Sequence, residues 1–136
     1  MYRVLIVDDD KLTRKGLIAS MPWKEYGMEV VGECSNGAQA LDFLESHEAD
    51  LVLTDLEMPV MSGMEFIKKA SVRYPYLQFV VLTVHTDFEY IQEALRMGII
   101  DYIAKVQFDR ENFDVILQRI ANRLNTKTKE MDMIHG

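Results

Sequence analysis

The sequence predicts an α/β protein with a doubly wound, five-stranded parallel sheet of strand order 2-1-3-4-5. Five short runs of β-branched and aliphatic residues alternate with five segments of helical periodicity along 136 residues. Several of these runs are apolar on both faces, which is typical of strands that helices cover on both sides. Right-handed crossovers between parallel strands place the helices on both faces of the sheet. The length indicates one domain.

Each strand is predicted by an apolar run that ends at a polar residue. The first run, VLIV, stops at three acids, and the third, LVLT, stops at a single acid. The second run is less regular, and the fourth and fifth end at a threonine and a lysine. We expect the strands at residues 4–7, 28–34, 51–54, 79–82 and 100–104.

Each helix is predicted by an apolar stripe and by signals at its ends. Capping residues mark most of the starts, since their side chains accept hydrogen bonds from the first free N–H groups. These residues are Asn36 with Gln39, Ser62 with Glu65, Asp87 and Asp109. Breaks at Pro22, Pro75 and Gly98 mark three of the ends. The expected stripes are Leu17, Ile18 and Met21; Leu41 and Leu44; Ile67, Ala70 and Tyr74; Phe88, Ile91 and Leu95; and Phe113, Leu117, Ile120 and Leu124.

The sequence becomes polar after Leu124 and loses its apolar stripe. We therefore expect the folded domain to occupy residues 1–124, with residues 125–136 forming a linker or a disordered tail.

Composition limits the class of protein. Hydrophobic residues make up 49% and charged residues 27% of the chain, as in ordinary soluble domains. The net charge of −7 argues against nucleic-acid binding by this segment itself. Cys34 is the single cysteine, so no disulfide framework is expected. The apolar run at residues 4–7 is too short for a signal peptide or a membrane span. We expect a cytoplasmic protein with no membrane contact.

Polar groups follow the strands at one edge of the predicted sheet. Asp8 and Asp9 follow the first strand, Asp55 the third, Thr83 ends the fourth, and Lys105 follows the fifth. Any one of them alone is more often a cap or a solvated loop residue. Doubly wound sheets bind ligands at this edge, in the crevice between the first and third strands. Three close carboxylates favour a hard cation such as Mg²⁺, and a carboxylate can accept a phosphoryl group. The set therefore fits phosphoryl transfer.

Four motifs resemble the receiver domain of bacterial two-component response regulators, which has a flavodoxin-like fold. They are VLIVDDD, TDLEMP followed by SGMEF, the Thr83 after FVVL, and DYIAK. The resemblance covers about residues 2–124. Two further stretches, PWKEYGMEVVGECSNGAQAL and TDFEYIQEAL, resemble receivers that precede an AraC-type DNA-binding domain.

The resemblance implies a role for each residue of the site. Asp55 matches the phosphoacceptor, and Lys105 matches the lysine that pairs with the phosphoryl oxygen. Thr83 and Tyr102 match the switch residues, whose movement reports phosphorylation. The implied Mg²⁺ ligands are Asp8, Asp9, Asp55 and the backbone carbonyl of Glu57.

The resemblance also implies partners. A sensor histidine kinase would donate the phosphoryl group, and the domain would catalyse only its own phosphorylation and dephosphorylation. The face made by the fourth helix, fifth strand and fifth helix would then control homodimer formation or contact with an output domain. A C-terminal transcriptional output domain, beyond this chain, would be the part that contacts DNA.

Two other functions stay open at this stage. Val84 and Val106 depart from the small residue and the proline that receivers normally carry there, which suggests a degenerate receiver that dimerises or docks without phosphate. Receivers often have a cis peptide bond before that proline. A cis bond before Val106 would cost about 3 kcal/mol, so we expect a trans or reshaped loop after Lys105. Asp8 and Asp10 also partly match the D-x-D-x-[TV] motif of haloacid-dehalogenase-type phosphatases, but Leu12 breaks it. No G-x-G-x-x-G follows a strand, which argues against a dinucleotide site.

Overall fold

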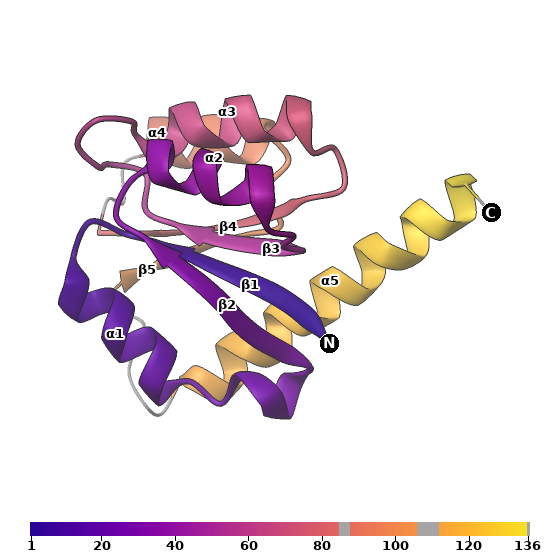
Figure 1. The fold of residues 1–136 in the computed structure, drawn as a ribbon. Coiled ribbons are helices and arrows are strands. Elements are labelled where there is room, and N and C mark those ends of the chain that lie inside the picture. Colours follow the sequence, from indigo (N-terminus) through magenta and orange to yellow (C-terminus); the bar gives the residue numbers. More distant parts are fainter. Residues whose placement is uncertain (85–87, 106–111, 136) are drawn as a thin grey trace.

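A five-stranded parallel sheet forms the middle layer of the protein. The computed structural model describes residues 1–84, 88–105 and 112–135, and its strands lie in the order β2-β1-β3-β4-β5 (Figure 1). The predicted fold class and strand order are thereby confirmed. The strands are β1 (Tyr2–Val7), β2 (Met28–Cys34), β3 (Leu51–Thr54), β4 (Gln78–Thr83) and β5 (Asp101–Ala104).

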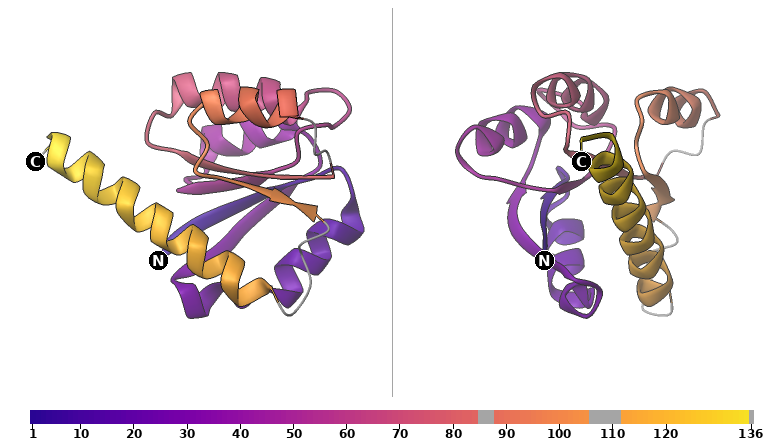
Figure 2. Two further views of the ribbon diagram at one scale, coloured as in Figure 1. Left: turned by 180° about the vertical axis from the view of Figure 1, so that it is seen from behind. Right: turned by 90° about the vertical axis from the view of Figure 1, so that its right-hand side faces the viewer.

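Helices cover both faces of the sheet. Two views show α2, α3 and α4 on one face and α1 and α5 on the other (Figures 1 and 2). The helices are α1 (Lys11–Ser20), the short 3-10 helix η1 (Trp23–Tyr26), α2 (Gly37–Ser46), α3 (Gly63–Arg73), α4 (Phe88–Arg96) and α5 (Phe113–His135). In the part of the chain that the structure describes, no helix combines the length and the apolar character needed to cross a membrane.

The core consists of two clusters, one on each face of the sheet. Alternate residues of a strand point to opposite faces. Leu5 and Val7 of β1 accordingly join the cluster under α2 and α3. Val4 and Ile6 join the cluster under α1 and α5. All four side chains are almost fully buried, so the central strands are anchored from both sides and hold their carboxyl ends in fixed positions.

Two of the predicted helix caps can be compared with the structure. Asn36 accepts a hydrogen bond from the Gln39 N–H at 2.9 Å, and Ser62 accepts one from the Glu65 N–H at 3.2 Å. In a capping box, the Gln39 side chain would accept a hydrogen bond from the Asn36 N–H. The structure differs in this bond. The Gln39 side chain accepts from the Ser35 N–H at 3.0 Å, one residue before the cap.

The fourth helix agrees with the prediction at its end but not on its buried side. Gly98 follows α4 with φ 80°, the left-handed conformation that glycine adopts without strain. Leu95, however, is 55% exposed, whereas Ala94 is fully buried. Ala94 belongs to the cluster under α2 and α3, so the buried side of α4 passes through Ala94 and the expected stripe through Leu95 is wrong. The predicted caps Asp87 and Asp109 lie outside the described residues.

The last helix is longer than predicted. Leu117, Ile120 and Leu124 are buried as expected, but α5 continues to His135 and its last turns extend beyond the sheet (Figure 2). Residues 125–135 are therefore helical and not disordered, and their role as a linker stays a prediction. This segment contains no glycine or proline to stop the helix. The Tyr2 hydroxyl also lies 3.0 Å from Asn125 Oδ1 and 3.1 Å from Thr128 Oγ1, which ties the departing helix to β1.

Candidate functional site

Strand register brings the acids of β1 and β3 together. Val7 pairs with Thr54, so the residues that follow, Asp8 and Asp55, leave the sheet side by side. The Asp55 N–H donates to the Val7 carbonyl at 3.0 Å and continues this pairing by one residue. The position of both acids is thus set by backbone hydrogen bonds.

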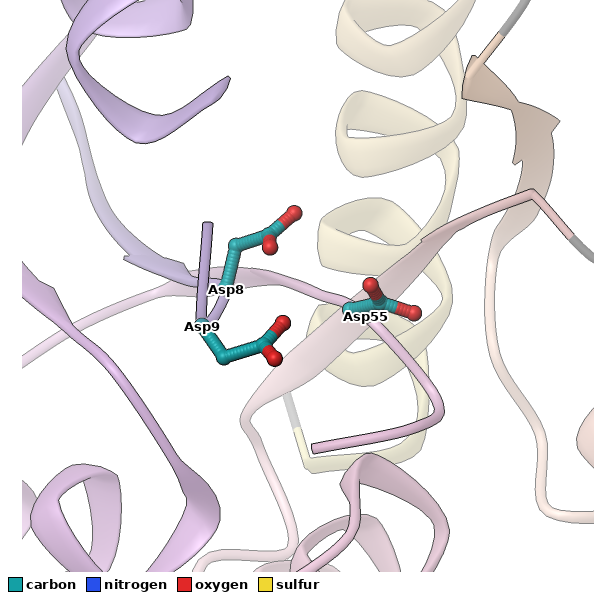
Figure 3. Close-up of side chains that lie close together, drawn as sticks. All are labelled: Asp8, Asp9 and Asp55. Atoms are coloured by element: carbon teal, nitrogen blue, oxygen red, sulfur yellow. The ribbon is translucent and has the colours of Figure 1, made fainter. Parts of the chain in front are cut away.

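Asp8, Asp9 and Asp55 form a cluster of three carboxylates. Each offers an oxygen that lies within 4.8 Å of the others. Figure 3 shows Asp8 and Asp9 reaching from the end of β1 toward Asp55. Asp8 is fully buried, Asp55 is 6% exposed, and Asp9 is exposed. The cluster therefore has a buried interior and one ligand at the surface, which is a suitable arrangement for a partly hydrated cation.

Lys105, directly after β5, contributes a positive charge to the site. Its Nζ lies 2.8 Å from Asp8 Oδ2 and 2.9 Å from Asp55 Oδ2, and its side chain is 18% exposed. Burial lowers the pKa of Lys105, but the two carboxylates outweigh it and the pKa is raised. Lys105 is therefore fully charged at neutral pH and partly offsets the repulsion within the acidic cluster.

Asp8 has the environment expected of a metal ligand. Burial is the largest influence on its pKa and raises it, against the opposing effects of Lys105 and the Asp10 N–H. Its Oδ1 accepts the Asp10 N–H at 2.9 Å. Within the described chain, Oδ2 is buried and accepts no hydrogen bond of acceptable geometry, although Lys105 lies close to it. Such an oxygen fits a cation better than it fits a purely structural role.

Replacing Asp8 by asparagine is expected to stabilise the protein at pH 7 in the absence of Mg²⁺. The folded state holds the Asp8 proton more tightly than the unfolded state, so ionisation of this group opposes folding. This penalty is absent below the ordinary aspartate pKa of about 3.9, where both states are protonated. It grows as the pH rises through the raised pKa. Urea unfolding of Asp8→Asn and the parent should differ at pH 7 and converge near that acid limit. A less stable variant at pH 7 would show that attraction to Lys105 outweighs burial.

The other predicted site residues are Thr83, Tyr102 and Glu57. Thr83 ends β4 and is fully buried, and Tyr102 on β5 is half-buried against the cluster under α2 and α3. The Glu57 N–H donates to Asp55 Oδ1 at 3.3 Å. Val84 is 65% exposed, so its side chain does not fill the buried interior of the site. Val106 lies outside the described residues.

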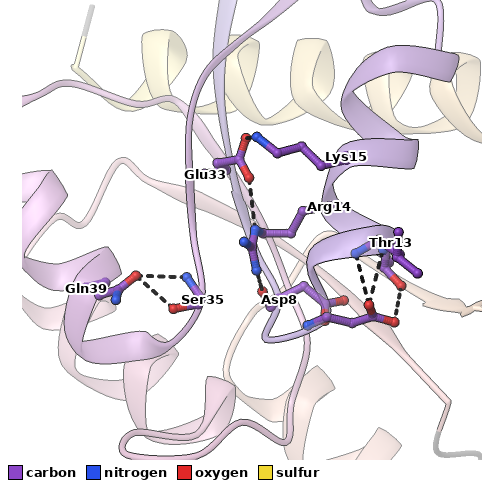
Figure 4. A network of polar contacts seen from close by, with 9 residues as sticks. Asp8, Thr13, Arg14, Lys15, Glu33, Ser35 and Gln39 are labelled. Carbon is purple, nitrogen blue, oxygen red and sulfur yellow. Dashed lines mark hydrogen bonds and ion pairs between the residues drawn. The ribbon is translucent and has the colours of Figure 1, made fainter.

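The structure adds a charged pair that no motif in the sequence indicates. Arg14 of α1 donates from Nη1 to the Asp8 carbonyl at 2.5 Å and from Nε to Glu33 Oε1 at 3.0 Å (Figure 4). Glu33 lies near the end of β2. The backbone of the acidic loop is therefore held by a side chain from a helix and, through it, by the neighbouring strand.

The loop from β3 to α3 packs tightly beneath Asp55. The Gly63 N–H donates to the Leu56 carbonyl at 2.9 Å. A Cβ atom at Gly63 would lie only 1.7 Å from the Asp55 carbonyl oxygen. In the same loop, Val60 is 85% exposed and has φ 73°, an unusual conformation for a β-branched residue. The start of α3 is thus packed closely against the backbone of Asp55.

Comparison with known proteins agrees with this geometry. The family model for the Response regulator receiver domain matches residues 4–120, and the chain belongs to this family. The REC domain of AraT, a response regulator from Geobacillus stearothermophilus, superposes with a TM-score of 0.83 and 33% identity. That comparison covers 93% of this chain and 98% of the other. A CheY-like receiver domain protein from Methanospirillum hungatei gives a TM-score of 0.81 and 26% identity over 96% and 98% of the two chains.

Curated relatives are longer than this chain. The uncharacterized transcriptional regulatory protein YesN of Bacillus subtilis is 35% identical over 105 residues, which cover 77% of this chain and 28% of YesN. The transcriptional regulatory protein HptR of Staphylococcus aureus is 29% identical over 124 residues, which cover 91% of this chain and 48% of HptR. The chain thus spans about half or less of these relatives.

Proposed function

We propose that this domain is a phosphorylation-controlled regulatory module that accepts a phosphoryl group on Asp55 from a sensor histidine kinase. The observation that carries this proposal is the convergence of three carboxylates and Lys105 at the strand ends. An Asp55 oxygen would form a bond to phosphorus while the bond between phosphorus and the histidine nitrogen breaks. The domain would catalyse only this transfer to itself and the later hydrolysis.

Mg²⁺ is the proposed cofactor, held by Asp8, Asp9, Asp55 and the backbone carbonyl of Glu57. Bound there, it would neutralise charge on the carboxylates and on the transferred phosphoryl group. Lys105 already contacts Asp55, and its ammonium group can pair with a phosphoryl oxygen added to that side chain.

The proposed output is a change in the surface around Thr83 and Tyr102. The phosphoryl group brings negative charge and strong acceptor oxygens beside the buried Thr83. A shift of Thr83 would be followed by Tyr102 on the adjacent strand, since β4 and β5 are paired. The face formed by α4, β5 and α5 would then change its contact with a second copy or an output domain. α4 and α5 each expose a large apolar side chain, Leu95 and Val115.

We propose a C-terminal DNA-binding output domain of the AraC type and a cytoplasmic location. The relatives named as transcriptional regulatory proteins are about twice as long as this chain or longer. The acidic net charge of −7 leaves DNA binding to that further domain.

Mg²⁺-dependent binding of beryllofluoride, followed by titration calorimetry, tests the proposal. The parent should bind the reagent only with Mg²⁺ present, and acetyl phosphate should label it under the same conditions. Failure of the folded parent to bind at millimolar reagent would favour the phosphate-independent docking module instead.

Asp9→Ala is expected to weaken Mg²⁺ binding at least about tenfold, because even outer-sphere partners of metal sites change affinity by that factor. Titration calorimetry measures the affinity directly. Asp10→Asn is the matched control, because Asp10 caps α1 and asparagine caps a helix equally well. Equal affinities of Asp9→Ala and the parent would place the metal away from the acidic pair.

A further inference from the structure

Two nitrogens of the Arg14 guanidinium group donate hydrogen bonds to other parts of the protein. Nη1 donates to the Asp8 carbonyl at 2.5 Å, and Nε donates to Glu33 at 3.0 Å. The Arg14 side chain is only 12% exposed. Figure 4 shows the group lying between the end of β1 and the end of β2. A largely enclosed guanidinium with two hydrogen-bond partners is more restrained than a solvated surface charge.

The Asp8 carbonyl belongs to the peptide that joins Asp8 to Asp9. The Asp8 N–H donates to the Cys34 carbonyl at 3.0 Å, and Asp8 Oδ1 accepts the Asp10 N–H at 2.9 Å. Together with the bond from Arg14, these contacts restrain the backbone before and after Asp9. Asp9 itself is exposed, so the direction of its carboxylate depends mainly on this backbone.

Glu33 in turn keeps Arg14 in place. Its second oxygen, Oε2, accepts a hydrogen bond from the Lys15 ammonium group at 2.7 Å. Lys15 and then Arg14 lower the pKa of Glu33, which is therefore charged at neutral pH. Lys15 is 57% exposed, so its contact is weak in solvent. The pair that matters for the loop is Glu33 with Arg14.

We propose that Arg14, held by Glu33, is a positioning residue that sets the affinity of the acidic cluster for Mg²⁺. This inference rests on the Mg²⁺ site of the proposed function. Arg14 has two opposite effects on a bound cation. Its positive charge repels the cation, whereas its hydrogen bond orders the Asp8–Asp9 peptide. The sign of the change after substitution therefore identifies which effect dominates.

Titration calorimetry of the whole chain with MgCl₂ tests this role. Arg14→Lys keeps the charge but loses the planar fork that reaches two partners, and it should weaken Mg²⁺ binding about tenfold. Arg14→Met should also weaken it, although loss of the charge alone would tighten it. Glu33→Gln should weaken it less. Lys15→Met removes the exposed ion pair only and should leave the affinity unchanged.

A second measurement separates positioning from a general loss of structure. Without Mg²⁺, the backbone amide signals of Asp9 and Asp10 should shift in Arg14→Lys while the thermal midpoint stays close to that of the parent. Parental affinity in Arg14→Lys, or tighter binding in Arg14→Met, would overturn the inference. If Arg14→Met does not fold, Arg14→Lys and Glu33→Gln decide the question. Absence of Mg²⁺ binding by the parent itself would overturn the proposed metal site and this inference with it.

Discussion

Asp55→Asn is expected to reduce phosphoryl labelling by acetyl phosphate or by a cognate kinase to background. The amide oxygen and nitrogen of asparagine are poor nucleophiles, so no acyl phosphate can form at this position. The substitution keeps the size of the side chain. It also leaves Lys105 its ion pair with Asp8 at 2.8 Å, so the fold should survive, as a circular dichroism spectrum and an unfolding curve would show.

Asp10→Asn provides the matched control for this experiment. Asp10 is close in sequence to the cluster, but its carboxylate accepts the Leu12 and Thr13 N–H groups at the start of α1. The Asp10→Asn variant should therefore be labelled like the parent. The label on the parent should be released by hydroxylamine, as expected of an acyl phosphate. Undiminished labelling of Asp55→Asn would show that another residue is the acceptor.

Gly63→Ala is expected to lower the free energy of unfolding by at least about 3 kcal/mol, at the upper end of overpacking effects. The added Cβ would lie 1.7 Å from the Asp55 carbonyl oxygen and 2.9 Å from Leu56 Cα. Both neighbours are backbone atoms that cannot rotate away, so α3 or the end of β3 must shift. The same shift should displace Asp55 and weaken Mg²⁺ binding in any fraction that folds. Urea unfolding and calorimetry measure the two effects.

Gly16→Ala is the corresponding control within α1. Apart from the adjacent backbone of α1, none of the described residues has an atom within 4 Å of a Cβ at Gly16. Alanine is also a better helix former than glycine by about 1 kcal/mol. This variant should be slightly more stable than the parent and should bind Mg²⁺ equally well. A Gly63→Ala protein as stable as the parent would show that the loop can relax without cost.

Much of the site could be predicted because it depends on topology and not on side-chain packing. The carboxyl ends of parallel strands lie at one edge, so Asp8, Asp55 and Lys105 had to come close if the strand order was right. The structure brings these three residues together with Asp9. Their chemical roles are predictions that the experiments above address.

The parts that could not be predicted depend on contacts between elements. Arg14 and Glu33 are 19 residues apart, and each alone resembles an ordinary surface charge. Their pairing requires the packing of α1 beside β2. Gly63 follows the cap Ser62 and looks like a permissive helix start, because its approach to Asp55 has no sequence signature. The end of α5 was missed because periodicity detects a buried stripe, and a helix that has already formed can continue without one.

The continuous α5 gives the domain a mechanical property. With 23 residues, the helix is about 34 Å long at 1.5 Å per residue. It is held near its start by the Tyr26 hydroxyl, which donates to Asp114 at 2.7 Å, and farther along by Tyr2. A helix held at several points moves together with the elements that hold it. If α5 tilts with them by about 5°, its far end is displaced by about 3 Å relative to its start. A small tilt at the sheet would thereby move the end of α5 by a distance comparable to the separation of two contacting side chains.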